Sequence, residues 1–149
     1  MEINKKVPDF EFTSTDNADD SLSNYIGKKV ILYFYPKDNT PGCTLEGNDF
    51  NHHYAEFEKK NAVIFGISRD SLVSHAKFCE KQGFTFPLIS DADGKICEMF
   101  DVIKEKNMFG KKVRGIQRST FLIDEQGRLV KEWRKVNVLG HAKDVLKAL

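Results

Sequence analysis

Apolar residues follow two patterns in the first half of the chain. Residues 29–35 and 62–67 form two short, nearly continuous apolar stretches, which are typical of strands buried on both faces of a sheet. Between them, apolar or small residues recur at alternating spacings of four and three, at Cys43, Gly47, Phe50, Tyr54 and Phe57. This periodicity predicts one amphipathic helix that begins near Cys43 and extends to about Lys60.

A second helix is predicted after residues 62–67. Asp70 or Ser71 can cap its start, and Gly83 is suited to end it. Its predicted apolar face consists of Leu72, Ala76 and Cys79.

The remaining predicted elements are shorter. In chain order they are a strand near 10–12, a loop over 13–27, a strand at 87–89, a helix at 94–100, a surface excursion over 101–115, two strands at 117–123 and 128–133 joined by a turn at 124–127, and a helix at 140–149. Strand–helix–strand units followed by a hairpin predict an α/β domain. We therefore expect one domain, residues 1–149, with a central mixed β-sheet flanked by helices on both faces.

Composition excludes several classes of function. The formal net charge is +1, which gives no electrostatic reason to expect nucleic acid as a partner. No stretch approaches the roughly 20 apolar residues of a spanning helix, and residues 1–8 lack the apolar core of a signal peptide. Three widely spaced cysteines argue against a secreted disulfide framework, and the four histidines lack zinc-site spacing. We expect a cytoplasmic protein that contacts no membrane and holds no metal.

Cys43 is the first candidate for chemistry, because it stands where a buried strand is followed by the start of a helix. Unpaired amides and the positive end of the helix dipole stabilise a thiolate at this position. Thr40 lies three residues earlier, where a dithiol reductase would have its first cysteine. The pattern therefore indicates a single-thiol nucleophile, although an isolated cysteine is more often a buried structural residue.

Three neighbours can serve that nucleophile. The hydroxyl of Thr40 can hold the thiolate or orient a bound oxygen, or it can simply cap the helix. Pro36 lacks an N–H and stiffens the wall of the pocket. Gly42 allows close approach of its backbone, so that nearby amides can bind developing negative charge.

The segment 33–44, with the pattern Pro-x-x-x-Thr-x-x-Cys, resembles the active site of peroxiredoxins. The residues of this segment are also similar to those of the bacterioferritin comigratory protein or peroxiredoxin Q subfamily. Segments 66–68, 86–91 and 118–124 are similar to the same subfamily. The resemblance extends over nearly the whole chain.

This resemblance implies a thioredoxin-like fold and a thiol-dependent peroxidase that reduces hydrogen peroxide or organic hydroperoxides without metal, haem or flavin. It also implies that Arg118 completes the site, a role for which the residues alone would not select it over Arg69 or Arg114. Many members carry a resolving cysteine five residues after the nucleophile, where this chain has Asn48. Others place it on the following helix.

Cys79 matches that second pattern, which implies an intramolecular Cys43–Cys79 disulfide, although Cys79 can also be a small core residue. Because a disulfide requires Cα atoms within about 4.4–6.8 Å, we expect one or both helices to unwind locally before it forms. Cys97 has apolar neighbours and is expected to be a buried, inert thiol.

Several alternatives remain open. Without Cys79, the protein would be a one-cysteine peroxidase that needs an external thiol. A thioredoxin-type dithiol oxidoreductase is disfavoured by Thr40. A redox sensor or holdase would react once and stop. The expected reductant is thioredoxin or a glutaredoxin-like protein, and an in-chain resolving cysteine favours a monomer.

Overall fold

A computed structural model describes the backbone of residues 1–149 and every side chain except that of Met108. The main sheet has seven strands in the order β2-β1-β5-β4-β3-β8-β9. The strands are β1 (Glu11–Ser14), β2 (Asp20–Ser21), β3 (Lys29–Phe34), β4 (Ala62–Ser68), β5 (Leu88–Ser90), β8 (Ser119–Ile123) and β9 (Leu129–Arg134). β3 pairs in parallel with β4 and antiparallel with β8. The predicted mixed sheet is therefore confirmed.

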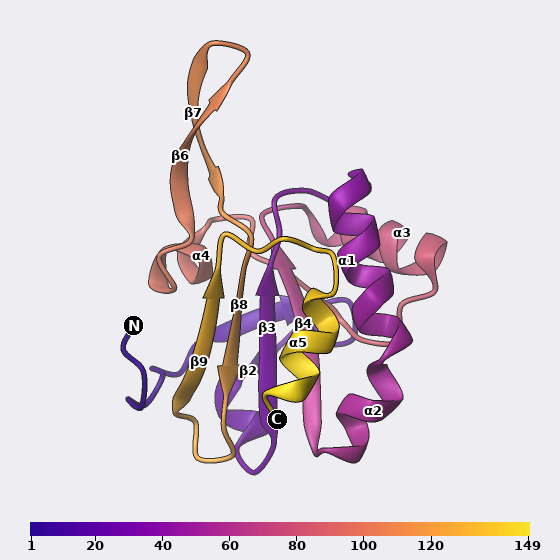
Figure 1. Ribbon diagram of the computed structural model, residues 1–149, viewed down its shortest axis with the longest axis vertical. Coiled ribbons are helices and arrows are strands. Elements are labelled where there is room, and N and C mark those ends of the chain that lie inside the picture. The colour runs from indigo at the N-terminus through magenta and orange to yellow at the C-terminus, as the bar shows by residue number, and fades with distance from the viewer.

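Alternate residues of β3 enter two separate cores, because successive side chains of a strand point to opposite faces. Ile31 and Tyr33 face a core shared with the helices α1 (Pro41–His52), α2 (Tyr54–Lys59), α3 (Leu72–Gln82) and α5 (His141–Lys147). Leu32 and Phe34 face a core that includes α4 (Lys95–Met99) and the 3-10 helix η1 (Leu22–Tyr25). Helices thus cover both faces, as predicted, and Figure 1 shows α5 in front of the sheet, beside β3.

The helix expected from Cys43 to Lys60 is two helices. α1 ends at His52 and α2 begins at Tyr54, with His53 between them. The apolar spacing continues across this break, and Phe50 and Phe57 are both buried. Periodicity therefore predicted the buried face correctly but did not detect the interruption.

The predicted apolar face of α3 is wrong at Leu72 and Ala76, whereas Cys79 is half-buried and packs against the core. Leu72 and Ala76 are exposed, whereas His75 and Phe78 are the buried residues of this helix. The ends of the helix agree with the prediction, since the Ser71 hydroxyl accepts from the Ser74 N–H and Gly83 has a φ of 71°. The face differs because a polar residue, His75, finds hydrogen-bond partners in the interior.

Regular structure occurs in two segments that were predicted only as a loop (13–27) and as a surface excursion (101–115). Residues 13–27 include the edge strand β2 and the helix η1. Residues 101–115 lie mostly in a hairpin of β6 (Ile103–Met108) and β7 (Lys111–Ile116). This hairpin projects beyond the sheet at the upper end of Figure 1, and Phe109 near its tip is fully exposed. In the part of the chain that the structure describes, no helix is long and apolar enough to span a membrane.

Candidate active site

Cys43 is the third residue of α1 and is almost completely buried, at 2% exposure. Thr40 takes the N-cap position and Pro41 begins the helix. The first helical hydrogen bond runs from the Thr44 N–H to the Thr40 carbonyl, at 2.9 Å. The amides of Gly42 and Cys43 precede that bond and belong to the helix start, where N–H groups stabilise negative charge.

The Thr40 hydroxyl does not cap the helix. It donates a hydrogen bond of 2.9 Å to the carbonyl of Lys37. A hydroxyl whose hydrogen is engaged this way presents its lone pairs as acceptors, which suits the O–H of a hydroperoxide. Pro36 is exposed and lies just beyond the end of β3. The role of Pro36 as a pocket wall stays a prediction.

Arg118 lies at the sulfur. Its Nη2 donates to Cys43 Sγ at 3.4 Å. Sheet pairing causes this contact: Phe34 pairs with Ser119, so the start of β8 and the end of β3 meet at one edge. A Cβ on Gly42 would stand 3.2 Å from Arg118 Nη2, so Gly42 also leaves room for the guanidinium.

Sequence reasoning missed Glu46. It is 1% exposed, and its Oε1 accepts from Arg118 Nη1 at 2.7 Å. Its helical spacing of three from Cys43 could have placed it on the same face of α1. Partial burial lowers the pKa of Arg118, but the charges of Glu46 and Cys43 outweigh this effect and leave the pKa raised. Glu46 thus holds one arm of the guanidinium while the other reaches the sulfur.

Burial raises the pKa of Glu46 to about 7, against the opposing effect of Arg118. The folded protein therefore holds this proton more tightly than the unfolded chain, whose carboxyl has the ordinary pKa of 4.5. As the pH rises from 4.5 to about 7, the unfolded chain releases this proton while the folded protein still holds it. The free energy of unfolding therefore falls over this pH range.

We therefore predict a different pH dependence for Glu46→Gln. Between pH 4.5 and 7 the wild-type free energy of unfolding should fall, through Glu46, by an amount on the order of 3 kcal/mol, and the variant should lack that fall. Urea unfolding of the reduced proteins across this pH range measures the difference. Parallel pH profiles for the two proteins would contradict it.

A second cation approaches the site from the hairpin. Lys106 of β6 donates to the carbonyl of Ile116 at the base of the hairpin. Partial burial and the charge of Arg118 lower the pKa of Lys106, while charge on Cys43 raises it. Nothing in the sequence pattern indicated this proximity, because residues 101–115 read only as a polar excursion.

All three cysteines are free thiols. Cys79 lies on α3, half-buried, with its sulfur 3.9 Å from the Thr15 hydroxyl. Burial raises its pKa to about 11, so Cys79 is a protonated thiol at neutral pH. Cys97 is fully buried on α4, and burial together with Asp91 raises its pKa well above the ordinary range. Its predicted burial is confirmed.

The structure thus brings together Cys43, Gly42 and Arg118, and it places Thr40 at the cap of the same helix. Cys79 is on another helix and is not bonded to Cys43. Tyr33 of β3 is buried in the same core as Cys43, and Cys79 packs against that core; burial raises the pKa of Tyr33. Together, fold and site define a thioredoxin-like protein with a buried cysteine at the start of a helix, in contact with an arginine.

Comparisons with known proteins agree with that class. The sequence model of the AhpC/TSA family matches residues 3–132. A peroxiredoxin Bcp of Xanthomonas campestris is 52% identical over the whole chain and 93% of its own length. A peroxiredoxin Bcp of Bacillus subtilis is 50% identical over the whole chain and 95% of its own length.

Solved structures give the same result. A cysteine-to-serine variant of Xylella fastidiosa PrxQ superposes with a TM-score of 0.94 at 48% identity, covering 99% of this chain and 94% of that one. The X. campestris bacterioferritin comigratory protein, studied for its alkyl peroxide reduction activity, has a TM-score of 0.89 at 52% identity, covering 93% and 88%. The chain belongs to the AhpC/TSA family and is a peroxiredoxin, a thiol-dependent peroxidase.

Proposed function

We propose that Cys43 is the peroxidatic cysteine and that Arg118 and Thr40 hold the hydroperoxide against it. The Cys43 thiolate attacks the terminal oxygen of ROOH, the O–O bond breaks, and the alkoxide leaves as ROH after taking a proton. The sulfur becomes a sulfenic acid. The single observation that carries this assignment is the 3.4 Å contact of Arg118 Nη2 with the buried Cys43 sulfur.

Each neighbour has a defined part in that step. Arg118 stabilises the thiolate and then the charge that develops on the separating oxygens. The Thr40 oxygen accepts from the peroxide O–H, and the amides near Gly42 face the same negative charge. Pro36 stiffens the loop that forms the wall of the pocket above the sulfur. Both hydrogen peroxide and organic hydroperoxides fit this scheme, and a structural relative has been studied for its alkyl peroxide reduction activity.

We further propose that Cys79 resolves the sulfenic acid. The Cys79 thiol attacks the Cys43 sulfur, a disulfide forms, and water leaves with the sulfenic oxygen and the thiol proton. Two solved structures of X. campestris peroxiredoxin Q are single cysteine-to-serine variants, and the two replaced cysteines have the same sequence separation as Cys43 and Cys79. The free, protonated state of Cys79 fits a thiol that becomes reactive only when α3 opens.

The disulfide then needs a dithiol reductant, and a thioredoxin-type protein is the partner that the family implies. A glutaredoxin-like protein is the other candidate. We propose a monomer, because the resolving cysteine is in the same chain, and a cytoplasmic location, because the cycle needs reducing equivalents.

The test is intact mass and peptide mapping after one equivalent of hydrogen peroxide. We expect the loss of two hydrogens and a Cys43–Cys79 cross-link, with Cys97 still alkylatable. Cys79→Ser should instead gain one oxygen at Cys43, and its turnover with thioredoxin should fall at least about tenfold. Cys97→Ser is the matched control, and it should form the same cross-link as the wild type.

Three other outcomes would revise the mechanism. Full turnover of Cys79→Ser with thioredoxin would establish a one-cysteine cycle. A single reaction followed by arrest, with excess peroxide and reductant present, would favour a redox sensor. An unmodified Cys43 would contradict the assignment of the nucleophile.

A further inference from the structure

The loop between β3 and the helix of Cys43 contains a buried carboxylate, Asp38, that faces α3. Its Oδ2 accepts from the Ser74 hydroxyl at 2.7 Å and lies 2.8 Å from His75 Nδ1. Its Oδ1 accepts from the Tyr35 hydroxyl at 2.7 Å. Hydrogen bonds and the His75 contact together keep the pKa of Asp38 low, although burial opposes them. A surface carboxylate in this loop would make no such set of contacts.

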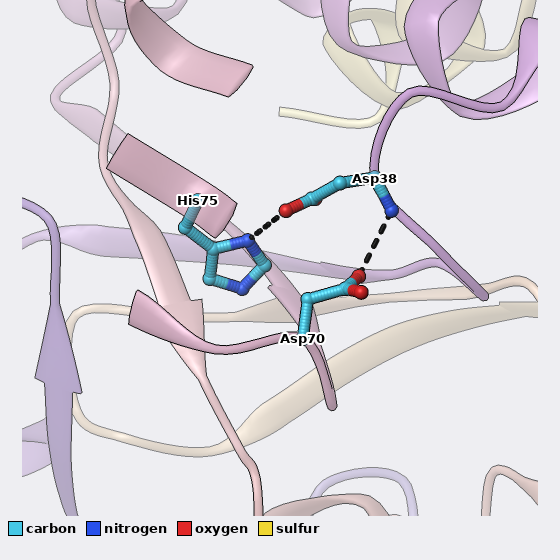
Figure 2. A group of neighbouring side chains, drawn as sticks. All are labelled: Asp38, Asp70 and His75. Atoms are coloured by element: carbon cyan, nitrogen blue, oxygen red, sulfur yellow. Dashed lines mark hydrogen bonds and ion pairs between the residues drawn. The ribbon is translucent and has the colours of Figure 1, made fainter. Parts of the chain in front are cut away.

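His75 connects the loop to the sheet. It is fully buried, and its Nε2 lies 2.9 Å from the carbonyl oxygen of Ile89. A carbonyl oxygen only accepts, so Nε2 carries a hydrogen and donates it. Nδ1 meets the Asp38 carboxylate, as Figure 2 shows. Both ring nitrogens are therefore held, and the ring fixes the first turns of α3 between the active-site loop and β5.

Asp70 makes a second connection between the same segments. Its Oδ2 accepts from the backbone N–H of Asp38 at 2.9 Å (Figure 2) and from the Ser68 hydroxyl at 2.6 Å. β3 and β4 are parallel, so the loops that follow them meet at one edge of the sheet. The ligand-type atoms of Asp38, Asp70 and His75 lie within 4.8 Å of one another, but these hydrogen bonds engage them, so the cluster reads as a structural connection rather than a cation site.

This connection joins the two halves of the proposed cycle. Asp38 is in the loop that leads to Cys43, and His75 is one helical turn before Cys79. We propose that the Asp38–His75 contact is a latch that positions α3 in the peroxide-reactive state and sets the rate at which Cys79 reaches Cys43. The inference rests on the proposed role of Cys79, and His75 acts as a positioning residue that touches no substrate.

The latch has a chemical consequence. While it is closed, Cys79 remains against Thr15 as a protonated thiol, and the Cys43 sulfenic acid persists. A second hydroperoxide can then oxidise that sulfenic acid to sulfinic acid, with release of ROH. When α3 opens, disulfide formation removes the sulfenic acid first. The strength of the latch therefore sets how easily the enzyme is inactivated at high peroxide.

The test separates the two chemical steps by rapid mixing, acid quench and mass spectrometry. In His75→Gln we expect the peroxide-independent step, from sulfenic acid to disulfide, to accelerate about tenfold, because a buried contact to a charged group is lost from the closed state. The peroxide-dependent oxidation of Cys43 should stay within about twofold of wild type. Sulfinic acid formed at high peroxide should decrease.

Companion variants isolate the contact. Asp38→Asn should accelerate disulfide formation, the second step, to a similar extent. The double variant Asp38→Asn/His75→Gln should be no faster than either single variant, because each substitution removes the same interaction. Ser74→Ala is the mild variant if His75→Gln does not fold, and it should give a smaller acceleration. Leu129→Ala, a buried substitution facing the opposite core, should lower global stability and leave the second step unchanged.

Amide hydrogen exchange of the reduced proteins gives a readout that needs no chemistry. Residues 72–82 should exchange about tenfold faster in His75→Gln than in wild type, with β8 unchanged. If His75→Gln and Asp38→Asn both form the disulfide at the wild-type rate and show wild-type amide exchange in α3, the latch alone is overturned. A wild-type protein that forms no Cys43–Cys79 disulfide would overturn the role of Cys79, and the latch as a control of resolution with it.

Discussion

Replacing Cys43 with serine is expected to abolish peroxidase turnover, with a loss of more than about a thousandfold, the scale on which enzymes lose activity when their nucleophile is removed. Serine keeps the shape of the side chain but stays protonated at neutral pH and is a far weaker nucleophile. In the proposed mechanism the helix start and Arg118 stabilise this sulfur as a thiolate, and Thr40 orients the hydroperoxide against it. Without it they have nothing to activate.

The measurement is hydroperoxide consumption in the presence of thioredoxin and its reductase. Cys97→Ser is the matched control, because Cys97 is equally buried but lies on α4, outside the site. It should retain turnover within about twofold. Appreciable activity of Cys43→Ser would mean that another thiol is the nucleophile, and Cys79 would then be tested first.

Replacing Arg118 with alanine should slow the oxidation of Cys43 about 10²- to 10³-fold, the usual cost of removing one donor that stabilises developing charge. The guanidinium makes two contacts at once, through Nη1 to Glu46 and Nη2 to the sulfur. A lysine ammonium is a single point charge that cannot reproduce this planar fork. Arg118→Lys should therefore recover only part of the loss.

The second-order rate constant for Cys43 oxidation, measured by rapid mixing with hydroperoxide, checks this result. Arg114→Ala is the control, since Arg114 is an exposed arginine on the hairpin, and it should react within about twofold of wild type. Arg118→Ala also leaves Glu46 buried without its partner, which lowers stability. Arg118→Ala/Glu46→Gln should regain stability but not rate. If it regains rate as well, Arg118 matters for folding and not for the reaction.

The local structure around Cys43 and in the strands was predictable, because the residues that cause it are close together in the sequence. The start of α1 follows from Thr40, Pro41 and the apolar strand before them, all within a few residues of Cys43. Strand β3 follows from its continuous apolar run, and the β8–β9 turn follows from residues 124–127, where Gly127 has a φ of 82°. These features depend on short-range sterics and hydrogen bonding.

The errors in the helices have a common physical reason. Apolar periodicity assigned Leu72 and Ala76 to the core and gave His75 no part in it. The observed face of α3 is set instead by Asp38 and by the Ile89 carbonyl, which make a buried imidazole favourable. A polar side chain can be buried when partners satisfy it, and those partners come from segments far away in the sequence.

The sequence by itself determined the position of Cys43 after a buried strand, the helix that begins beside it and the alternation of strands and helices that makes the sheet. Only the tertiary structure decided what surrounds the sulfur: strand register carries Arg118 to Cys43, burial on α1 pairs Glu46 with that arginine, and parallel strands bring Asp38 against α3. The reason is that these contacts depend on how distant segments pack, which no local pattern of residues encodes.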